Sequence, residues 1–158
     1  MVSARPAVAA DVPRLVELCR RNQAEIGAQE RGGSVFVARE ARPEPVEDSL
    51  LSALDSPDAT VVVGMIDGTP IGYATGRTEA LRDGTTLGVI DDLYVEEEAR
   101  SVGVGEAMMD LLLQWFGDRG CAGVDSLALP GARATKNFFE ESGFTARLLV
   151  MHHRMASG

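Results

Sequence analysis

The sequence predicts an α/β fold of the mixed α+β kind, in which a central mixed, mostly antiparallel sheet carries helices on both faces. Segments with the spacing of strands and of helices follow one another in the order β α α β β β α β α β. Two apolar strand-like runs are joined by a two-residue turn, and a long amphipathic segment follows them. With 158 residues, the chain has the length of one domain, so we expect a single domain over residues 1–158.

The amino-terminal part predicts one strand followed by one helix. Residues Val2 to Val8 have the composition of a short strand. Asp11 then supplies an N-cap, and Pro13 falls in the first helical turn, where its missing N–H has no cost. Apolar residues with helical spacing predict the buried stripe of this helix: Leu15, Leu18, Cys19 and Ile26.

The segment from residue 27 to residue 45 has no regular period. It contains turn-forming glycines and prolines around a single apolar island at 35–37. Such a segment predicts a loop, or a lid over a site that the rest of the chain forms. From Val46 onward apolar residues return at helical spacing, which predicts a short helix that the Ser56-Pro57 pair ends.

The middle of the chain predicts an antiparallel hairpin and a third strand. The runs 61–66 and 71–76 are joined through Asp67 and Gly68, which tolerate the positive φ angles of a type I′ turn. A third strand is expected over Leu87–Val95, after a polar connection.

The carboxyl-terminal part begins with a long amphipathic helix. Its apolar stripe includes Trp115, and it ends near Gly120, a plausible C′ glycine. The remaining segments predict a strand, a short helix and a last strand: Val124–Leu129, Thr135–Ser142 and Arg147–Met151. An exposed edge strand after Phe144 would offer a pairing surface for a homodimer.

The composition disfavours several classes of function. The formal net charge of −9 argues against a surface that coats nucleic acid, since phosphate contacts need clustered cations, and it favours amine-bearing partners. No apolar run reaches the about 20 residues that cross a bilayer, and the first residues lack the apolar region of a secretory signal. Cys19 and Cys121 lie in apolar surroundings, as in a reducing compartment. We therefore expect a soluble cytoplasmic protein that binds neither nucleic acid nor membrane.

No metal site is expected. The spacing of histidines, cysteines and carboxylates does not match a ligand set. His152 and His153 are adjacent, so they would point to opposite sides of a strand rather than toward one ion.

A strand-to-helix turn at residues 100–106 is the most informative local feature. The N–H groups of such a turn and of the first helical turn have no partner within the helix, so they can hold an anion. Gly103 and Gly105 would let phosphate oxygens approach the main chain without a Cβ in the way, and Arg100 adds a charged donor. The turn predicts a pyrophosphate site, while a tight turn that only packs a helix closely is the alternative.

The spacing of this turn resembles the R/Q-x-x-G-x-G/A motif of the GNAT family of acyl-CoA-dependent N-acyltransferases, with Arg100, Gly103 and Gly105 in the matching positions. The segment 135–144 is similar to that family's second CoA-facing helix, because it carries an aromatic pair, acidic residues and a closing Gly-Phe. The resemblance covers nearly the whole chain. It implies the GNAT fold and an N-acetyltransferase with acetyl-CoA as acyl donor.

The resemblance also implies a set of cofactor-binding residues. The strand at 91–95 would splay from its neighbour and bind pantetheine through main-chain groups, the following amides would hold the pyrophosphate, and the later helix would flank the pantetheine arm. The implied cofactor-binding residues are Leu93, Tyr94, Val95, Arg100, Ser101, Val102, Gly103, Val104, Gly105, Glu106, Arg133, Asn137 and Phe138.

Two positions depart from the family's pattern. Phe139 stands where many relatives carry a tyrosine that protonates the departing CoA thiolate, and Ala132 stands where an asparagine is often found. Phenylalanine cannot donate a proton. A thiol with a pKa near 8.5 is still a fair leaving group, so the missing acid would cost about 1–2 kcal/mol.

The candidate catalytic residues are Asp91, Asp92 and Tyr94. Regular alternation places the two aspartates on opposite faces of the strand, so one of them would point toward the acceptor. That carboxylate would act as a base through water or anchor an ammonium group. The alternative, in which both are solvated or cap a bulge, is equally compatible with the sequence, and Tyr94 would either touch the cleft or pack in the core.

The sequence thus predicts transfer of an acetyl group from acetyl-CoA to a primary amine, on a small molecule or a peptide, by direct attack on the thioester. Because of Phe139, a catalytically silent acyl-CoA-binding or regulatory domain on the same fold is the alternative. A third interpretation, an acidic interaction module, predicts no CoA binding at all. The acceptor depends on the segment 27–45, whose residues indicate no particular substrate.

Overall fold

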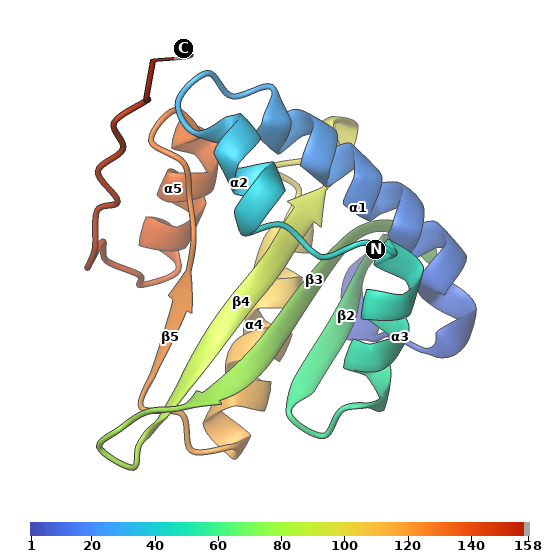
Figure 1. The fold of residues 1–158 in the computed structure, drawn as a ribbon. Coiled ribbons are helices and arrows are strands. Elements are labelled where there is room, and N and C mark those ends of the chain that lie inside the picture. Colours follow the sequence, from blue (N-terminus) through green and yellow to red (C-terminus); the bar gives the residue numbers. More distant parts are fainter. Residues whose placement is uncertain (157–158) are drawn as a thin grey trace.

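The computed structural model describes residues 1–156 and contains a five-stranded sheet in the order β1-β2-β3-β4-β5 (Figure 1). The first four strands are antiparallel, and β5 pairs in parallel with β4. The strands are β1 (Val2–Pro6), β2 (Ala59–Ile66), β3 (Thr69–Ala80), β4 (Thr86–Val95) and β5 (Gly123–Ser126). The helices are α1 (Val12–Gly27), α2 (Gly33–Arg39), α3 (Val46–Asp55), α4 (Val104–Asp118) and α5 (Arg133–Glu141). The predicted mixed, mostly antiparallel sheet is confirmed.

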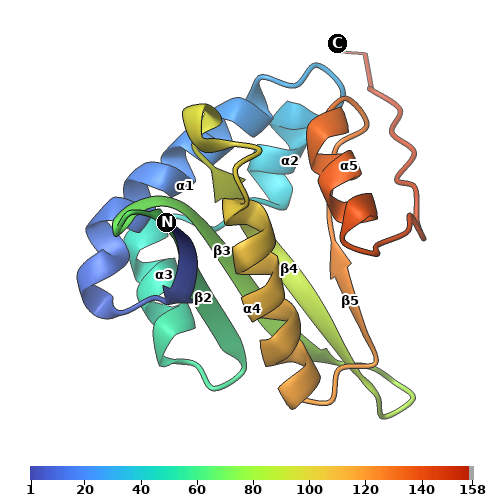
Figure 2. The ribbon, with the colours of Figure 1, turned by 180° about the vertical axis from the view of Figure 1, so that it is seen from behind.

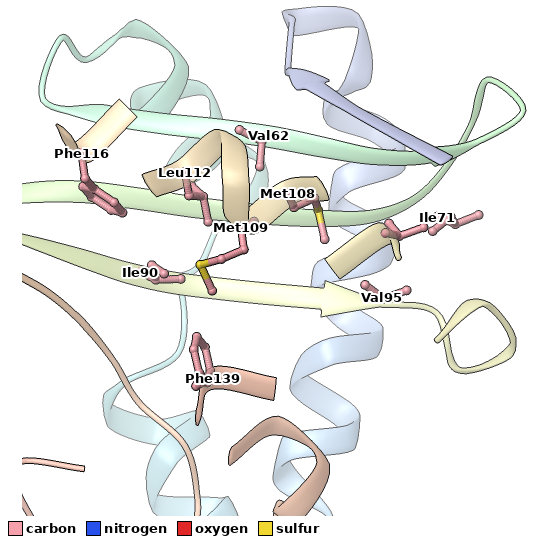
Figure 3. Close-up of a cluster of buried hydrophobic side chains, with 11 residues drawn as sticks. Val62, Ile71, Ile90, Val95, Met108, Met109, Leu112, Phe116 and Phe139 are labelled. Carbon is pink, nitrogen blue, oxygen red and sulfur yellow. The ribbon is translucent and has the colours of Figure 1, made fainter. Parts of the chain in front are cut away.

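Helices cover both faces of the sheet. Helices α1 and α3 lie on one face and α4 crosses the other, as two opposite views show (Figure 1, Figure 2). On the α4 face one core is formed (Figure 3) by Val62, Ile71, Ala74, Ile90, Val95, Val104, Met108, Met109, Leu112, Phe116 and Phe139. On the α1 face a second core is formed by Leu15, Leu18, Cys19, Val46, Leu50, Val61, Val63, Tyr73 and Tyr94.

The β2–β3 hairpin forms as the sequence predicts. Asp67 and Gly68 have φ angles of 49° and 81°, which are the two positive values that a type I′ turn requires. Gly120, with a φ of 68°, lies just beyond the end of α4 and confirms the predicted helix stop.

Asp11 precedes α1 as predicted, but its carboxylate makes no cap hydrogen bond to that helix. Its oxygens accept hydrogen bonds from both terminal nitrogens of Arg5, each at 2.8 Å, and from the Val8 N–H at 2.8 Å. The contact with Val8 is a local back-bond of the kind that capping rules describe, whereas the pairing with Arg5 joins β1 to the turn before α1, which such a rule does not predict.

The segment 27–45 is more ordered than the sequence predicts, because α2 forms within it. The predicted apolar island at 35–37 lies inside this helix. Gly32, with a φ of 85°, turns the chain into α2. The helix is only seven residues long, so its periodicity gave too little signal to predict it.

The predicted last strand, Arg147–Met151, is wrong: residues 145–156 have no strand or helix, and Leu148, Leu149, Val150 and Met151 are exposed. The segment is linked to β5 by the Arg147–Asp125 ion pair but by no main-chain ladder. A short apolar run favours a strand only where a neighbouring edge supplies its hydrogen bonds. The predicted edge strand for homodimer pairing is therefore also not formed.

Candidate active site

A cavity of about 370 Å³ opens beside the carboxyl-terminal half of β4. Its walls come from that half-strand, the chain after β5, the start of α4, and helices α1, α2 and α5. Nine of the thirteen residues predicted for the acyl donor line this cavity together with the two predicted aspartates, whereas Val102, Gly103, Val104 and Arg133 do not. The fold thus brings together segments that lie far apart in the sequence.

The splay predicted for the strand at 91–95 is confirmed. Strand β4 pairs with β5 from Leu87 to Ile90 only, and the last pair is Ile90 with Ser126. Beyond it the chain leaves β4, and residues 126–129 line the opposite wall of the cavity. The predicted strand Val124–Leu129 is accordingly shorter, because its last three residues have no ladder partner on β4.

This divergence leaves main-chain groups of β4 directed at the cavity. The Glu96 N–H donates to the Ile71 carbonyl at 2.9 Å, which fixes the alternation of the antiparallel ladder with β3. By that alternation the main chain of Tyr94 pairs with β3, whereas the N–H and C=O groups of Leu93 and Val95 point away from it. The Leu93 main chain and the Val95 N–H are therefore open to a ligand, whereas the Val95 carbonyl already accepts a hydrogen bond from Arg100 and the Tyr94 main chain is engaged by β3.

The N–H groups of residues 101–106 form the second open main-chain element. Within the described residues none of them donates to a backbone or side-chain acceptor, and the first bond of the helix runs from the Ala107 N–H to the Gly103 carbonyl. Ser101, Gly105 and Glu106 line the cavity. This run of unpartnered N–H groups, at the positive end of a 15-residue helix, matches the donor set that an anion requires.

The two positions of this turn require glycine for different physical reasons. Gly103 has a φ of 99°, a left-handed conformation, and a Cβ placed there would meet only Val2, at 3.9 Å. A Cβ at Gly105 would lie 3.0 Å from Cε1 of Phe138 and 3.2 Å from its Cζ. The expectation that residue 105 is glycine in order to admit phosphate is therefore incomplete, because the Phe138 ring of α5 occupies the space that a Cβ would fill.

Arg100 is held within the protein. Its Nε donates to the Val95 carbonyl at 2.8 Å, its Nη2 to Glu25 at 2.8 Å, and its guanidinium lies 5.5 Å from the centre of the Tyr94 ring. Hydrogen bonding by Glu25 raises the pKa of Arg100. The side chain thus ties the turn to β4 and α1.

Helix α5 presents both its predicted residues and its departures to the cavity. Exposed Asn137 and half-buried Phe138 line it, whereas Arg133 does not. Phe139 is buried and packs edge to face on Phe138 and Phe144, with ring centres 5.8 Å and 5.2 Å apart. The predicted contact of Arg133 with the nucleotide stays a prediction.

The two aspartates lie on one face of the sheet, so the predicted opposite orientation is wrong. Strand β4 has an extra residue here: Thr75 pairs with Asp92, but the next residue of β3, Gly76, pairs with Ile90. The side chain of Ile90 packs in the α4 core, whereas Asp91 and Asp92 both line the cavity. A bulge of this kind interrupts the alternation on which the expectation rested.

Asp92 is held by a buried ion pair. Its Oδ2 accepts hydrogen bonds from Nε and Nη2 of Arg42, at 2.9 and 2.7 Å, and from the Thr75 hydroxyl at 2.7 Å. The side chains of Asp92 and Arg42 are only 7% and 8% exposed. The two charges therefore compensate each other inside the protein.

Asp91 is the less constrained carboxylate. Its partner is Arg77, whose Nε lies 3.0 Å from Oδ2, and the two side chains are 34% and 45% exposed. Burial raises the pKa of Asp91, the nearby Asp92 charge raises it further, and Arg77 and Arg42 oppose the shift. A carboxylate with a raised pKa is a better proton acceptor than an ordinary one.

Tyr94 is buried in the α1 core and also lines the cavity. Burial raises the pKa of its phenol. Both alternatives for this residue, core packing and contact with the cleft, therefore describe its position.

Sequence reasoning did not find Arg42 or Thr75. Arg42 lies in the irregular stretch between α2 and α3, and no local pattern indicates that it reaches β4, 50 residues further along the chain. Thr75 follows from the hairpin register once the bulge is known. Both residues are identified only by long-range contacts of the folded chain.

Within residues 1–156, no group of three or more histidine, cysteine or carboxylate side chains is placed to hold a metal ion. Over the same part of the chain, no helix has the length and apolar character needed to cross a membrane.

The chain was compared with known proteins. The model of the acetyltransferase (GNAT) family matches residues 28–144. No match was found among curated proteins. An aminoglycoside acetyltransferase from an uncultured soil metagenomic sample, solved with sisomicin, is 18% identical with a TM-score of 0.72, covering 99% of this chain and 97% of that one.

Two further solved structures have the same fold. A tetramutant of the BH1408 protein from Bacillus halodurans is 16% identical with a TM-score of 0.81, covering 96% of this chain and 99% of that one. The aminoglycoside N-acetyltransferase AAC(6')-Iy, solved with CoA, is 15% identical with a TM-score of 0.76, covering 99% and 96%.

The mixed sheet, the splayed strand and the family match define the class of this protein. The chain belongs to the acetyltransferase (GNAT) family and has the GNAT fold, which confirms the resemblance seen in the sequence. It is an acyltransferase of a family that uses acyl-CoA, and its general activity is acetyl transfer.

Proposed function

We propose that this protein is an N-acetyltransferase that transfers the acetyl group of acetyl-CoA to a primary amine. The observation that carries the proposal is the run of unpartnered N–H groups at 101–106 beside the open edge of β4. An anion site and a free strand edge next to each other match a ligand with a diphosphate and an amide-bearing arm.

The residues present fit such a donor. The N–H groups from Ser101 to Glu106 would hold the diphosphate, and the main chains of Leu93 and Val95 would bind the pantetheine amides. Asn137 and Phe138 would flank the arm from α5. When bound, acetyl-CoA supplies an acetyl group activated as a thioester.

The open N–H groups of β4 have a second role at the reacting carbonyl. The N–H groups of Leu93 and Val95 project from a strand that the β3 ladder holds in place. Donors fixed in this way stabilise negative charge that develops on an oxygen, a contribution worth about 3 kcal/mol for one such donor.

The charge of the cavity favours an amine acceptor. Five carboxylates line it, Glu25, Asp91, Asp92, Glu106 and Glu141, and Arg100 is the one guanidinium among its lining residues. Glu25, Asp91 and Asp92 pair with Arg100, Arg77 and Arg42, so the net negative charge of the cavity comes from Glu106 and Glu141. Carboxylates attract an ammonium ion, which must lose a proton before its nitrogen can attack. For an alkyl ammonium with a pKa near 10.4 this costs about 4.6 kcal/mol at pH 7, so a base close to the acceptor is required.

The aromatic ring of Phe139 supplies no proton to the departing thiolate. The thiolate then leaves without a tyrosine acid, at a cost of about 1–2 kcal/mol. This substitution is the specific observation that favours the second candidate, a catalytically silent acyl-CoA-binding domain.

One assay separates these functions. The protein is incubated with acetyl-CoA and a library of primary amines, and free thiol is measured together with CoA-induced thermal stabilisation. Thiol release that depends on an amine supports the proposal. Stabilisation without thiol release across the library supports the silent domain, and the absence of both contradicts acyl-CoA binding.

A further inference from the structure

We propose that Arg42 is a positioning residue that gives the two neighbouring aspartates different roles. It holds Asp92 as a fixed anion, and Asp91 is left as the carboxylate that takes the proton from the acceptor's ammonium group. This inference rests on the proposed function, because it concerns the acceptor side of the same cavity.

Asp92 has one oxygen that is fully engaged. Its Oδ2 accepts three hydrogen bonds, two from Arg42 and one from Thr75, which exceeds the two lone pairs of a carboxylate oxygen. Within the described residues its Oδ1 has no hydrogen-bond donor, and it is not sealed from the cavity that Asp92 lines. Asp92 can therefore present Oδ1 to an ammonium group while Arg42 and Thr75 hold its Oδ2 in place.

Hydrogen bonds to three residues hold the Arg42 guanidinium in place. Its Nη1 donates to the Ser49 hydroxyl at 2.8 Å, and its Nη2 donates to Thr75 at 2.7 Å as well as to Asp92. The guanidinium is thus anchored to both α3 and β3. A guanidinium suits this position because its donors have a fixed planar arrangement that an ammonium group does not offer.

Asp91 differs from Asp92 in its hydrogen bonds and in its exposure to solvent. Among the described residues its one hydrogen-bond donor is Nε of Arg77, on a half-exposed side chain, so its oxygens have lone pairs to spare. The charged groups that face it are Arg77 from β3, Asp92 beside it on β4, and Arg42 from the stretch between α2 and α3. Three more carboxylates line the same cavity: Glu25 from α1, Glu106 from α4 and Glu141 from α5.

The proton step balances within these groups. An N–H bond of the acceptor's ammonium breaks, an O–H bond forms on Asp91, and the electron pair stays on the nitrogen, which becomes the nucleophile. The proton then leaves Asp91 for solvent at the mouth of the cavity. Asp92 remains an anion throughout, and Arg42 touches neither substrate nor proton.

The two aspartates are tested by their pH profiles with an amine that the wild-type protein acetylates. Asp91→Asn should lower kcat by about 10²–10⁴ and remove the acid limb of the kcat/KM profile. Asp92→Asn should keep that limb and act mainly by raising the KM of the amine. The reverse pattern, with the acid limb lost only in Asp92→Asn, overturns the proposal.

Arg42 is tested by the titration of Asp91, followed by carboxyl ¹³C NMR in the full chain without ligand. Arg42→Met removes a charge that lowers the pKa of Asp91, so the Asp91 midpoint should move to higher pH. In Arg42→Lys, which keeps the charge, the midpoint should lie closer to the wild-type value than in Arg42→Met. Arg39→Met, which removes an exposed arginine paired with Glu40, is the matched control and should leave the midpoint unchanged.

The outcomes separate this inference from the proposed function. If no amine is acetylated but the Asp91 midpoint moves as expected, the function fails while the electrostatic role of Arg42 stands. If amines are acetylated and the Asp91 midpoint is the same in wild type, Arg42→Met and Arg39→Met, the positioning role is overturned. Where Arg42→Met does not fold, Arg42→Gln serves in its place, because glutamine keeps a hydrogen-bond donor for Asp92 but carries no charge.

Discussion

The two sides of the cavity are built from different chemical groups. On the donor side, main-chain N–H groups of the α4 turn and of β4 face the cavity, and the side chains there mostly support the backbone. On the acceptor side, a buried ion pair of side chains, Asp92 and Arg42, sets the position of the carboxylates. A backbone site depends on turn geometry over a few residues, whereas a side-chain site depends on contacts between distant segments.

This difference predicts that the two sides fail in different ways. Damage to the acceptor side should reduce the stability of the whole fold, because a charge is left buried without its partner. Damage to the donor side should have a smaller effect on stability and a specific effect on binding.

The largest effect is expected at the acceptor side. Arg42→Ala should lower the free energy of unfolding by about 3–5 kcal/mol, because Asp92 stays buried without its counter-charge. Urea unfolding followed by circular dichroism measures it. The double variant Arg42→Met/Asp92→Leu should recover much of the loss, since it removes both charges. A single-variant loss below about 1 kcal/mol would show that water already solvates this pair.

The second prediction concerns close packing on the donor side. Gly105→Ala places a Cβ 3.0 Å from the Phe138 ring, so we expect a loss of about 1–3 kcal/mol as α5 is pushed away from α4. Gly117→Ala in the same helix is the control. Nothing lies within 4 Å of a Cβ there, and alanine should stabilise the helix by up to about 1 kcal/mol. Equal effects of the two changes on thermal unfolding would contradict the packing role of Gly105.

The third prediction separates backbone strain from binding. Gly103→Ala and Gly84→Ala both force a left-handed conformation on alanine, at φ angles of 99° and 86°, and each should cost about 1–2 kcal/mol. Only Gly103→Ala should also weaken stabilisation by CoA, because its turn orients the free N–H groups. Loss of the CoA effect in both proteins, or in neither, would argue against an anion site at this turn.

The smallest effect is expected at the partly buried pair of Arg5 and Asp11. Hydrogen bonds from Arg5 lower the pKa of Asp11, so its contribution to stability is present above the unfolded-state pKa of about 3.9 and is lost as the pH falls through the lower folded value. Asp11→Asn should cost about 0.5–1 kcal/mol at pH 7 and little at strongly acidic pH. Arg5→Gln should give the same pH dependence, and a cost independent of pH would exclude the linkage.

The comparison of the two sides also explains how far the sequence could be interpreted. Hydrophobic periodicity predicted the hairpin, β4, α4 and α5, because each is long enough to show a period or has its own turn residues. The donor turn was predicted from the spacing of Arg100, Gly103 and Gly105, which are neighbours in the chain.

Features that depend on a partner could not be predicted in this way. The run 147–151 has the composition of a strand but no edge to pair with, and α2 is too short to show a period. The pairing of Arg42 with Asp92 joins residues 50 positions apart. The bulge in β4 leaves no mark in the sequence, since Asp91 and Asp92 satisfy simple alternation equally well.

Because of the bulge, the number of residues in β4 decides which of its carboxylates face the cavity. If the ladder with β3 ran without the extra residue, alternation would turn one of the two aspartates toward Phe116 and the α4 core. When relatives are aligned to this chain, a gap of one position near residue 91 therefore decides which of their acidic residues correspond, and an ungapped alignment by identity alone would match the wrong carboxylates.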